Sequence, residues 1–599
     1  MSIAVLIKQV PSSQDLSLGE DLSLKRDGVD LEINPYCRRA LATALRLGKE
    51  RHEPCIVLSM GPPSAERALQ EALALGADKA VLLSDPKLAG SDILATSRAL
   101  AAALNRLGPL SVVLCGKFSI DAETGLVPAQ LAELLGFPLL DGVRRLDLRG
   151  DRAFVEVETD SGWMEASSTL PVLLTCAERL CSPARAGVDE VDVIDHERIV
   201  RLGVGGLGPG LWGSSASPTA VRAIRRVAAD RLRRQLEGTL DDQVRAVVEL
   251  VQARATVRDA DRPSSVVPAP LWETPSSKVV VVGEPGRPDT ARELLAMAAD
   301  AAQHLATLVT VVVTTGSLGL DLLSGWGADY VMEVDAMESA DEIAWLIGKW
   351  SGTSRPELVL LPSTTWGREV AGRIAARTQS GLVSDVIRIE FDENLGGFLY
   401  VKPALSGSEL AEITSNTPMN CVTVRPGSRP SPRPRAPRSI QRINAPQVEE
   451  LSKRTIERVV VEDDLEQLNQ ATIIVGMGMG VGEAGLSHLR AIIKPLNAEL
   501  ATTRKVTDRH WLPRSRQIGI TGRHVAPEIY LAVGLSGKYN HMIGVSAART
   551  VLAVNIDPSA PVFDHADLGI VGDWSVVLPA IVAGLSGIAL PSTSTIALS

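Results

Sequence analysis

Four short apolar runs within residues 517–574 constrain the fold more than any other feature of this chain. They are rich in isoleucine, leucine and valine, and each ends in a polar or glycine-rich turn: QIGITG, IYLAVG, TVLAVN and LGIVG. Runs without apolar–polar alternation are typical of strands buried on both faces of a parallel sheet. Because ligands bind outside the carboxyl ends of such strands, these turns predict a binding site for an elongated, phosphate-bearing ligand.

Length and composition limit the kinds of protein to which this chain can belong. A chain of 599 residues is too long for one core, so several domains are expected. Aromatic residues make up only 3%, which favours aliphatic α/β cores, and the net charge of −10 argues against a dedicated nucleic-acid binder. No apolar run approaches the roughly 20 residues of a membrane helix, and the N-terminal MSIAVLIKQV is expected to be a first strand rather than a signal peptide.

The cysteines and histidines predict a reduced protein without a metal site. The six cysteines form no CxxC pair, and the eight histidines show no metal-ligand spacing. Scattered thiols in apolar contexts are typical of the reducing cytoplasm. We therefore expect a cytoplasmic protein with buried thiols.

The first half of the chain divides into an α/β domain and a different segment behind it. Residues 1–205 alternate strand-like and helix-like patterns, which predicts βαβ units and a mostly parallel sheet. Residues 206–275 lose this rhythm: 221–257 show helical spacing with many arginines, and a stretch rich in proline, serine and threonine follows. We expect a helical insert and a linker there, and the arginine-rich face is either a docking surface or a solvated face.

The α/β pattern restarts at residue 276 and runs to 424. Gly-Ala-Asp stands between a helix and a strand at 76–78 and again at 327–329. GPLSVVLCG at 108–116 is echoed by RPELVLLPS at 355–363. Two echoes in the same order, offset by about 250 residues, indicate an internal duplication and hence two lobes of related fold.

A Pro/Arg-rich linker at 425–450 precedes the last domain, 451–590. The expected strand TIIVG is followed by GMGMGVGEAG, in which Gly480, Gly482 and Gly485 have GxGxxG spacing. A strand, a glycine turn and a helix in this order can hold a phosphate. A tight turn that needs glycine for packing would give the same letters equally well.

Several motifs resemble electron transfer flavoproteins. INPYCRRALATALRL (33–47) and GKFSIDAETGLVPAQLAELLG (116–136) resemble the beta subunit. LLPSTTWGREVAGRIAAR with GLVSD (360–385), and then QIGITGRHVAPEIYLAVGLSGKYNH, AVNIDPSAPVF and VGDW, resemble the alpha subunit. The resemblance covers nearly the whole chain except about 205–275, and it implies beta and alpha subunits fused in one chain.

The resemblance implies a fold and a function. The expected fold class is α/β: two related adenine-nucleotide-hydrolase-like α/β lobes plus a C-terminal parallel-sheet FAD-binding domain. The expected function is to shuttle electrons on FAD from a dehydrogenase to a downstream acceptor, as a carrier rather than a substrate-converting enzyme. The alternative is a nucleotide-binding regulatory protein for NAD(P) or AMP, or a redox-altered relative.

The resemblance also carries over FAD-binding positions. An arginine near the flavin ring, here Arg504, raises the reduction potential by favouring reduced, negatively charged forms. Thr521 matches the residue that hydrogen-bonds the reactive edge of the ring, and His541 matches a donor beside its pyrimidine portion. The full set is Thr503, Arg504, Gln517, Ile518, Gly519, Ile520, Thr521, Ser536, Gly537, Lys538, Tyr539, Asn540, His541, Asn555, Asp573 and Trp574. Met479 stands where an arginine is usual in the family, and Ile520 where a glutamine is usual.

A second nucleotide site, for AMP or a second FAD, is implied in the beta-like domain. Its positions are Leu6, Asn34, Pro35, Tyr36, Cys37, Met60, Asp121, Thr124, Gly125 and Val127. Leu126 and Pro128 replace a usual glutamine and a usual glycine, and proline lacks the amide that would hold a phosphate.

The implied partners are a dehydrogenase donor and a redox acceptor protein, with a homo-oligomer left open. Nucleic acid and membrane insertion are not expected. The segment after the strand that ends near Thr175 is acidic, unlike the basic docking loop of the family, which leaves open a donor other than the common acyl-CoA dehydrogenases.

Overall fold

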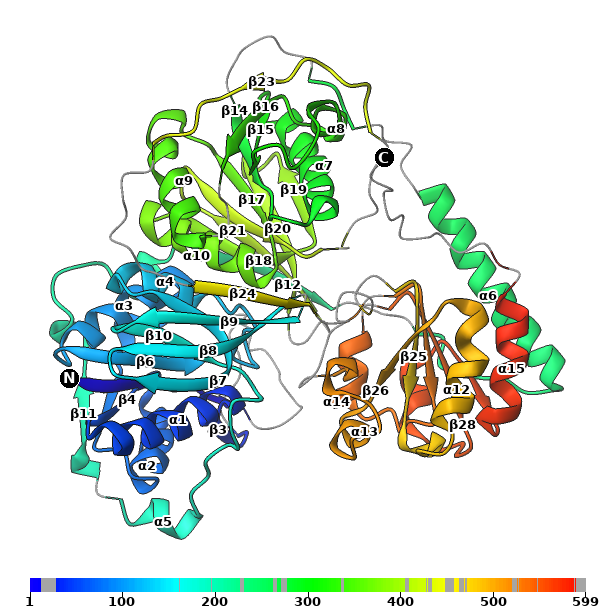
Figure 1. Ribbon diagram of the computed structural model, residues 1–599, viewed down its shortest axis with the longest axis horizontal. Helices are drawn as coiled ribbons and strands as arrows, with labels where there is room; N and C mark the ends of the chain where they lie inside the picture. The colour runs from blue at the N-terminus through cyan, green and yellow to red at the C-terminus, as the bar shows by residue number, and fades with distance from the viewer. Residues whose placement is uncertain are drawn as a thin grey trace.

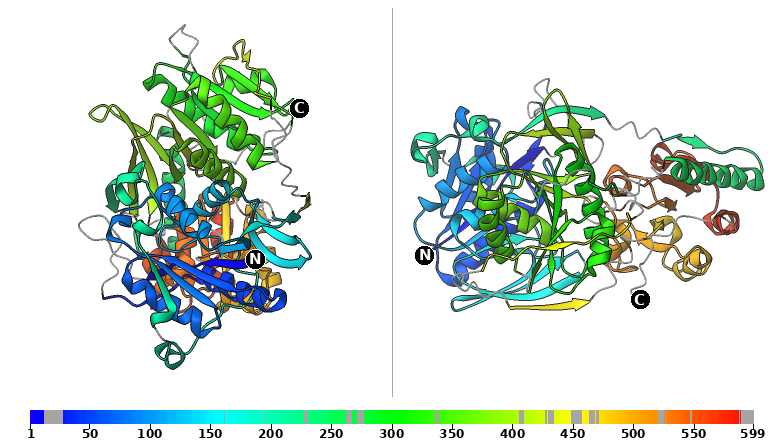
Figure 2. Two further views of the ribbon diagram at one scale, coloured as in Figure 1. Left: turned by 90° about the vertical axis from the view of Figure 1, so that its left-hand side faces the viewer. Right: turned by 90° about the horizontal axis from the view of Figure 1, so that it is seen from above.

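The computed structural model consists of two α/β lobes and a C-terminal domain beside them (Figure 1). Figure 2 shows the same three bodies from the side and from above. The structure describes residues 1–11, 28–160, 162–194, 196–226, 231–261, 267–270, 277–335, 339–404, 409–426, 428, 434–447, 457–462, 468, 471–519, 525, 527–546, 548–586 and 588.

The first lobe is built on a ten-stranded sheet in the order β11-β5-β4-β1-β6-β10-β7-β8-β9-β24. Its strands are β1 (Ser2–Leu6), β4 (Cys55–Met60), β5 (Lys79–Leu83), β6 (Leu110–Gly116), β7 (Leu139–Arg149), β8 (Arg152–Thr159), β9 (Gly162–Thr169), β10 (Val172–Cys176), β11 (Ile199–Leu202) and β24 (Glu457–Glu462). Its helices are α1 (Pro35–Arg51), α2 (Glu66–Ala74), α3 (Ile93–Asn105), α4 (Val127–Leu135) and α5 (Val188–Asp192), and β2 (Gln9–Pro11) pairs with β3 (Leu31–Ile33).

The second lobe repeats this topology. Its sheet has the order β23-β16-β15-β14-β17-β22-β18, which matches β11-β5-β4-β1-β6-β10-β7 position by position. The predicted related folds are therefore confirmed. Its elements are β14 (Ser277–Val282), α7 (Pro288–His304), β15 (Leu308–Thr314), α8 (Leu320–Trp326), β16 (Tyr330–Val334), α9 (Ala340–Ser354), β17 (Leu358–Pro362), α10 (Thr365–Thr378), β18 (Gly381–Val386), β22 (Asn420–Val424) and β23 (Gln441–Arg442), with the hairpin strands β19 (Arg388–Asp392), β20 (Gly397–Ala404) and β21 (Glu409–Ser415).

The two lobes exchange edge strands. β12 (Thr219–Arg226), which follows the first lobe in sequence, pairs antiparallel with β21 of the second lobe. β24, which follows the second lobe, pairs antiparallel with β9 of the first lobe. The expectation of a helix over 221–257 is therefore wrong for its first part, because pairing with β21 decides the conformation of a short segment.

Residues 231–254 of the segment expected to be an insert belong to the C-terminal domain, whereas Val267 packs against Gly327 of the second lobe. β13 (Arg234–Gln235) pairs with β29 (Leu568–Val571), and α6 (Leu240–Asp261) lies along α15 (Trp574–Leu585), as Figure 1 shows. Val247 and Val251 of α6 are buried in the same core as the strands of that domain. The described parts of 206–275 therefore do not form a separate helical insert, because β12 joins a sheet of the second lobe and Leu236, Val247 and Val251 complete the core of the C-terminal domain.

The lobes meet where α4 of the first packs on α10 of the second. A Cβ added at Gly372 would lie 2.6 Å from the Cβ of Ala129, so the two helices approach as closely as small residues permit. The Arg373 side chain is buried there, with its Nε 3.1 Å from Glu369 and its Nη1 3.5 Å from Glu133 of the first lobe. The packing of Gly372 on Ala129 and the Arg373–Glu133 ion pair join the lobes, whereas the Glu369 contact lies within α10.

The C-terminal domain has a six-stranded parallel sheet in the order β13-β29-β28-β27-β25-β26. Three of the four predicted apolar runs form the strands β27 (Ile529–Val533), β28 (Thr550–Asn555) and β29, which are almost entirely buried. The prediction is wrong for the described part of the first run, 517–519, where Gln517 makes an isolated bridge to Thr502 and no strand forms. The remaining elements are β25 (Ile473–Met477), α12 (Leu486–Ile493), β26 (Glu499–Thr502), α13 (Arg504–Asp508) and α14 (Tyr539–Met542). The strand order reverses between β25 and β27, which is where open α/β sheets bind ligands.

Membrane-spanning helices and clustered metal ligands are both missing from the described residues. No helix in the described part of the chain is both long enough and apolar enough to span a bilayer. Within the same residues, no group of three histidine, cysteine, aspartate or glutamate side chains is placed to hold a metal ion.

Candidate functional site

The carboxyl ends of the strands in the C-terminal domain lie along one edge. In the parallel register Met477 pairs with both Thr502 and Val533, Val533 pairs with Val554, and Asn555 pairs with Val571. The turns that follow these residues therefore lie side by side. This is the edge that the sequence predicted as a ligand site.

Two glycine loops touch at the point where the strand order reverses. A Cβ added at Gly478 would lie 2.2 Å from the carbonyl oxygen of Gly534, and one added at Gly480 would lie 2.8 Å from it. The Gly480 N–H donates to that same oxygen at 2.8 Å. Packing therefore requires both glycines, whereas a Cβ at Gly482, where φ is +73°, would meet no atom within 4 Å.

Gln517 and Ile518 line the interior of the domain rather than its surface. Both are buried, and the Gln517 side-chain oxygen accepts from the Thr507 hydroxyl at 2.7 Å. The Ile518 N–H donates to Thr502 O at 2.9 Å, which holds this loop beside β26. Gly519 follows with a φ of +127°, and the predicted positions Ile520 and Thr521 lie outside the described residues.

His541 is buried and both of its ring nitrogens are engaged. Nε2 lies 2.6 Å from the Tyr530 hydroxyl, and Nδ1 lies 3.1 Å from Ile518 O. A carbonyl only accepts, so Nδ1 carries the proton and Nε2 accepts from Tyr530. Burial lowers the pKa of His541 to about 4, against the opposing effect of the Ile518 hydrogen bond, so the ring is neutral. In this arrangement His541 joins α14 to β27 and to the loop at Ile518, and it has no free N–H.

The loop after β27 presents polar groups to solvent. The Ser536 and Lys538 side chains are exposed, and among the described residues no carboxylate forms an ion pair with Lys538. Gly537 lies against the Val562 backbone, where a Cβ would come within 2.1 Å, so this loop is held firmly. The predicted positions Tyr539 and Asn540 are the first two residues of α14.

The remaining predicted positions shape the edge. Asn555 Nδ2 donates to Leu535 O at 2.9 Å, which joins the ends of β27 and β28. Asp573 caps α15, accepting from the Ser575 N–H and hydroxyl at 2.8 Å each, and these bonds lower its pKa. The Trp574 ring packs against Gly485.

Arg504 connects this edge to the first lobe. Its side chain is 53% exposed, and its guanidinium lies 3.7 Å from Glu178 of the first lobe and 3.5 Å from Asp508. The preceding residue, Thr503, is half-buried. An exposed cation therefore stands where the strand edge of the C-terminal domain faces the first lobe.

Comparisons with known proteins agree with this arrangement. A model of the electron transfer flavoprotein domain matches residues 21–198 and 279–462. The chain belongs to the electron transfer flavoprotein family. A second model, the FAD-binding domain of the alpha subunit, matches residues 467–546, which contain the glycine loops and the switch point.

Individual members of the family align with different parts of the chain. It is 34% identical to the electron transfer flavoprotein subunit alpha of Mycobacterium leprae, over 48% of this chain and 91% of that protein. It is 33% identical to the subunit beta of Thermoanaerobacterium thermosaccharolyticum, over 43% of this chain and all of that protein. It is 32% identical to the protein FixB of Rhizobium meliloti, over 38% of this chain and 66% of that protein.

The cofactor of this electron transfer flavoprotein is FAD. The strand-edge residues suit its chemistry, because exposed donors at Ser536 and Lys538 stand beside the switch point and are matched to phosphate. The close approach of Gly478, Gly480 and Gly534 leaves no side chain of those residues over the edge. The exposed donors beside bare glycine loops suit the phosphates of FAD.

Several of the residues predicted for a second nucleotide site contact residues of the same loops. Asn34 Nδ2 donates to Phe118 O at 2.7 Å, and Lys8 Nζ lies 2.8 Å from the Asp121 carboxylate. Leu6, Asn34 and Cys37 are buried, and Gly125 adopts a φ of +63° beneath the Phe118 ring, where a Cβ would come within 2.6 Å. Pro35 begins α1 and Val127 begins α4, while Tyr36 contacts Phe118 edge-on at 6.1 Å between ring centroids. Met60 ends β4, and Thr124 lies in the same loop as Asp121.

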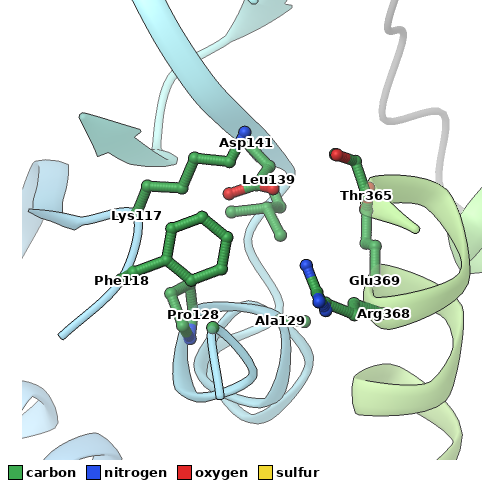
Figure 3. Close-up of a pocket in the computed structure, with 10 residues that line it drawn as sticks. Lys117, Phe118, Pro128, Ala129, Leu139, Asp141, Thr365, Arg368 and Glu369 are labelled. Atoms are coloured by element: carbon green, nitrogen blue, oxygen red, sulfur yellow. The ribbon is translucent and has the colours of Figure 1, made fainter. Parts of the chain in front are cut away.

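The Phe118 ring also lines a narrow cleft between the lobes. Lys117 Nζ and the Arg368 guanidinium lie 5.7 Å and 5.6 Å from its centroid, from opposite lobes (Figure 3). Leu126 is fully buried in the core of the second lobe. The leucine at this position therefore anchors the loop across the interface. Sequence reasoning missed Phe118 and Lys8, because nothing in the sequence shows that they fold back onto this loop.

Proposed function

We propose that this chain is an electron transfer flavoprotein in which a beta-like part precedes an alpha-like part, and that it carries electrons from a dehydrogenase to an acceptor protein. The FAD-binding model of the alpha subunit falls at 467–546, in the last third of the chain, which supports this order. The match of separate relatives to the alpha and beta subunits supports a fusion. The strand edge of the C-terminal domain carries the proposal, because it presents exposed donors and a cation at a switch point.

Bound FAD supplies the electron-accepting and electron-donating chemistry. We assign Ser536 and Lys538 to its phosphates, and Arg504 and Thr503 to the ring end that faces the first lobe. Asn555, Asp573 and Trp574 shape the edge through their contacts with Leu535, Ser575 and Gly485. His541 acts by position: its bonds to Tyr530 and Ile518 hold the loops on which the cofactor lies. No general base is needed, because the protein only binds and orients FAD and tunes its reduction potential.

The partners and the location belong to the same proposal. The segment after β10 carries the exposed residues Asp189 and Glu190, so the donor is not expected to use the basic docking mode of the family. We place the protein in the cytoplasm on its cysteine usage. The observations give no support to the alternative of a nucleotide-binding regulator, because the matched models are those of electron transfer flavoproteins. We assign neither AMP nor a second FAD to the positions predicted in the first lobe, because Asn34 and Asp121 already bond to Phe118 and Lys8.

Arg504→Met tests the position of the ring. Losing the cation is expected to lower the two-electron reduction potential of bound FAD by about 20 mV or more, because an exposed unit charge at about 4 Å contributes about 1 kcal/mol. The measurement is a spectroelectrochemical titration of the purified protein. Lys505→Met is the matched control, an exposed cation one residue along α13. Equal shifts for both variants, or none for Arg504→Met, would contradict the assignment.

A further inference from the structure

A groove on the C-terminal domain lies at the other end of the sheet from the FAD edge. It holds about 390 Å³ and lies between the end of α12, the start of β26 and the loop after α13. Its floor is aliphatic: Ile493, Leu500 and Leu512. Its volume falls within the range of binding clefts, and it contains none of the residues assigned to FAD.

The walls of this groove are positively charged. Arg490 and Lys494 are exposed, one helical turn apart, and among the described residues neither has a carboxylate within 4 Å. Arg516 is also in the wall and pairs with Glu499. Like charges at this spacing repel each other, so an anion bound between Arg490 and Lys494 would reduce their electrostatic repulsion. The groove therefore suits an acidic ligand with an aliphatic part.

The same chain carries a segment of complementary chemistry. In and after α5, Asp189 and Glu190 are exposed and have no cation within 4 Å among the described residues, although Glu190 caps the Gly187 N–H at 2.8 Å. Val193 follows and is 80% exposed, more than any other large apolar side chain in the described residues. Two carboxylates without a nearby cation, beside an exposed valine, match two cations without a nearby carboxylate, beside an aliphatic floor.

One chain does not fill its own groove. α5 lies at the foot of the first lobe in Figure 1, whereas α12 lies on the outer side of the C-terminal domain. Each molecule therefore presents the α5 segment and the basic groove on different surfaces, and the two do not meet within one chain. We propose that the α5 segment of one copy of this chain docks in the basic groove of a second copy, with Asp189 and Glu190 on Arg490 and Lys494 and with Val193 over the aliphatic floor.

The proposed contact is small and electrostatic, which sets its properties. Exposed ion pairs are screened by salt, and a short segment covers less surface than a permanent dimer needs. The association is therefore expected to be reversible and to weaken strongly between about 0.1 M and 1 M salt. It does not depend on the FAD edge, so FAD content is expected to stay the same in every variant below.

Sedimentation velocity on the full-length protein over a concentration series tests this contact. Arg490→Glu/Lys494→Glu and, separately, Asp189→Lys/Glu190→Lys are each expected to raise the dissociation constant of self-association at least about tenfold. A mixture of the two double variants is expected to associate, because the unmodified segment of one fits the unmodified groove of the other and the reversed segment fits the reversed groove. Arg106→Glu, an exposed cation of the first lobe, is the control and is expected to associate like the unmodified chain.

Any of three results would overturn the proposal. The first is that the unmodified chain remains a monomer at every concentration at low salt, and the second is that either double variant associates as strongly as the unmodified chain. The third is that the mixture does not associate although each double variant, alone, is folded and retains FAD. Loss of FAD from the unmodified chain would contradict the proposed function instead and leave the contact to be judged on association alone.

Discussion

Gly478→Val is expected to remove FAD from the protein. The added Cβ would lie 2.2 Å from Gly534 O and 2.3 Å from Leu535 Cα, and both are backbone atoms of the neighbouring strand end. Backbone held in a parallel sheet cannot move aside without breaking the register of β25 and β27. We expect the FAD-to-protein ratio after gel filtration to fall to near zero, and the C-terminal domain to lose several kcal/mol of stability, at the upper end of the about 1–3 kcal/mol of ordinary overpacking.

The matched control is Gly319→Val, the same substitution at a glycine before α8 that has no neighbouring atom within 4 Å of the added Cβ. It is expected to keep FAD at the level of the unmodified chain. Circular dichroism should show both lobes of Gly478→Val still folded, because their sheets do not involve β25 or β27. A Gly478→Val protein with a full complement of FAD would show that the switch point does not form the site.

Asp567→Asn is expected to detach the segment 231–254 from the C-terminal domain. Asp567 is fully buried and lies 2.9 Å from Arg231 and 2.8 Å from Arg254, and its carboxylate also accepts from the Val551 N–H at 2.8 Å. Removing one charge leaves two arginines partly buried without their anion. Breaking a buried pair in this way costs about 3–5 kcal/mol. Chemical denaturation should show the loss, and proteolysis within residues 231–254 should become faster.

The pH dependence of this contact has a definite sign. Burial raises the pKa of Asp567, but the Arg254 hydrogen bond, the Val551 N–H and the arginine charges outweigh it and leave the pKa lowered. A lowered pKa means that this stabilisation is complete above the ordinary aspartate range and is lost as pH falls through the lowered value. Asp564→Asn, an exposed carboxylate three residues earlier, is the control and is expected to change stability by less than about 0.5 kcal/mol. Equal losses for the two variants would show that the Asp567 carboxylate does not hold the segment.

The sequence predicted the strands of the C-terminal domain well because buried strands have an aliphatic composition. β27 and β28 are aliphatic along most of their length, as strands covered on both faces of a parallel sheet must be. The duplication was also visible, since the two lobes keep the same turns in the same order. By contrast, β12 has a short pattern of valine, isoleucine and arginine that suits a helix or a strand. Only its pairing with β21, nearly 200 residues away, decides between them.

For the site, the sequence predicted the position of the edge but not the partners of its side chains. His541 was predicted to offer a donor to FAD, whereas its bonds to Tyr530 and Ile518 use both ring nitrogens. Tyr530 was missed because it lies within an apolar run and nothing in that run indicates where its hydroxyl points. The clamp of Arg231 and Arg254 on Asp567 joins residues more than 300 positions apart, so spacing could not reveal it.

One measurement in two steps tests the central claim most directly. The absorption spectrum of the purified full-length protein is recorded, and the compound that the protein releases on denaturation is then identified by chromatography. We predict a yellow protein with the absorption bands of an oxidised flavin, which are bleached by a chemical reductant. We also predict that denaturation releases FAD, about one per chain, and not AMP or NAD(P). A colourless protein that takes up no FAD on reconstitution would contradict the claim that this chain carries electrons on FAD.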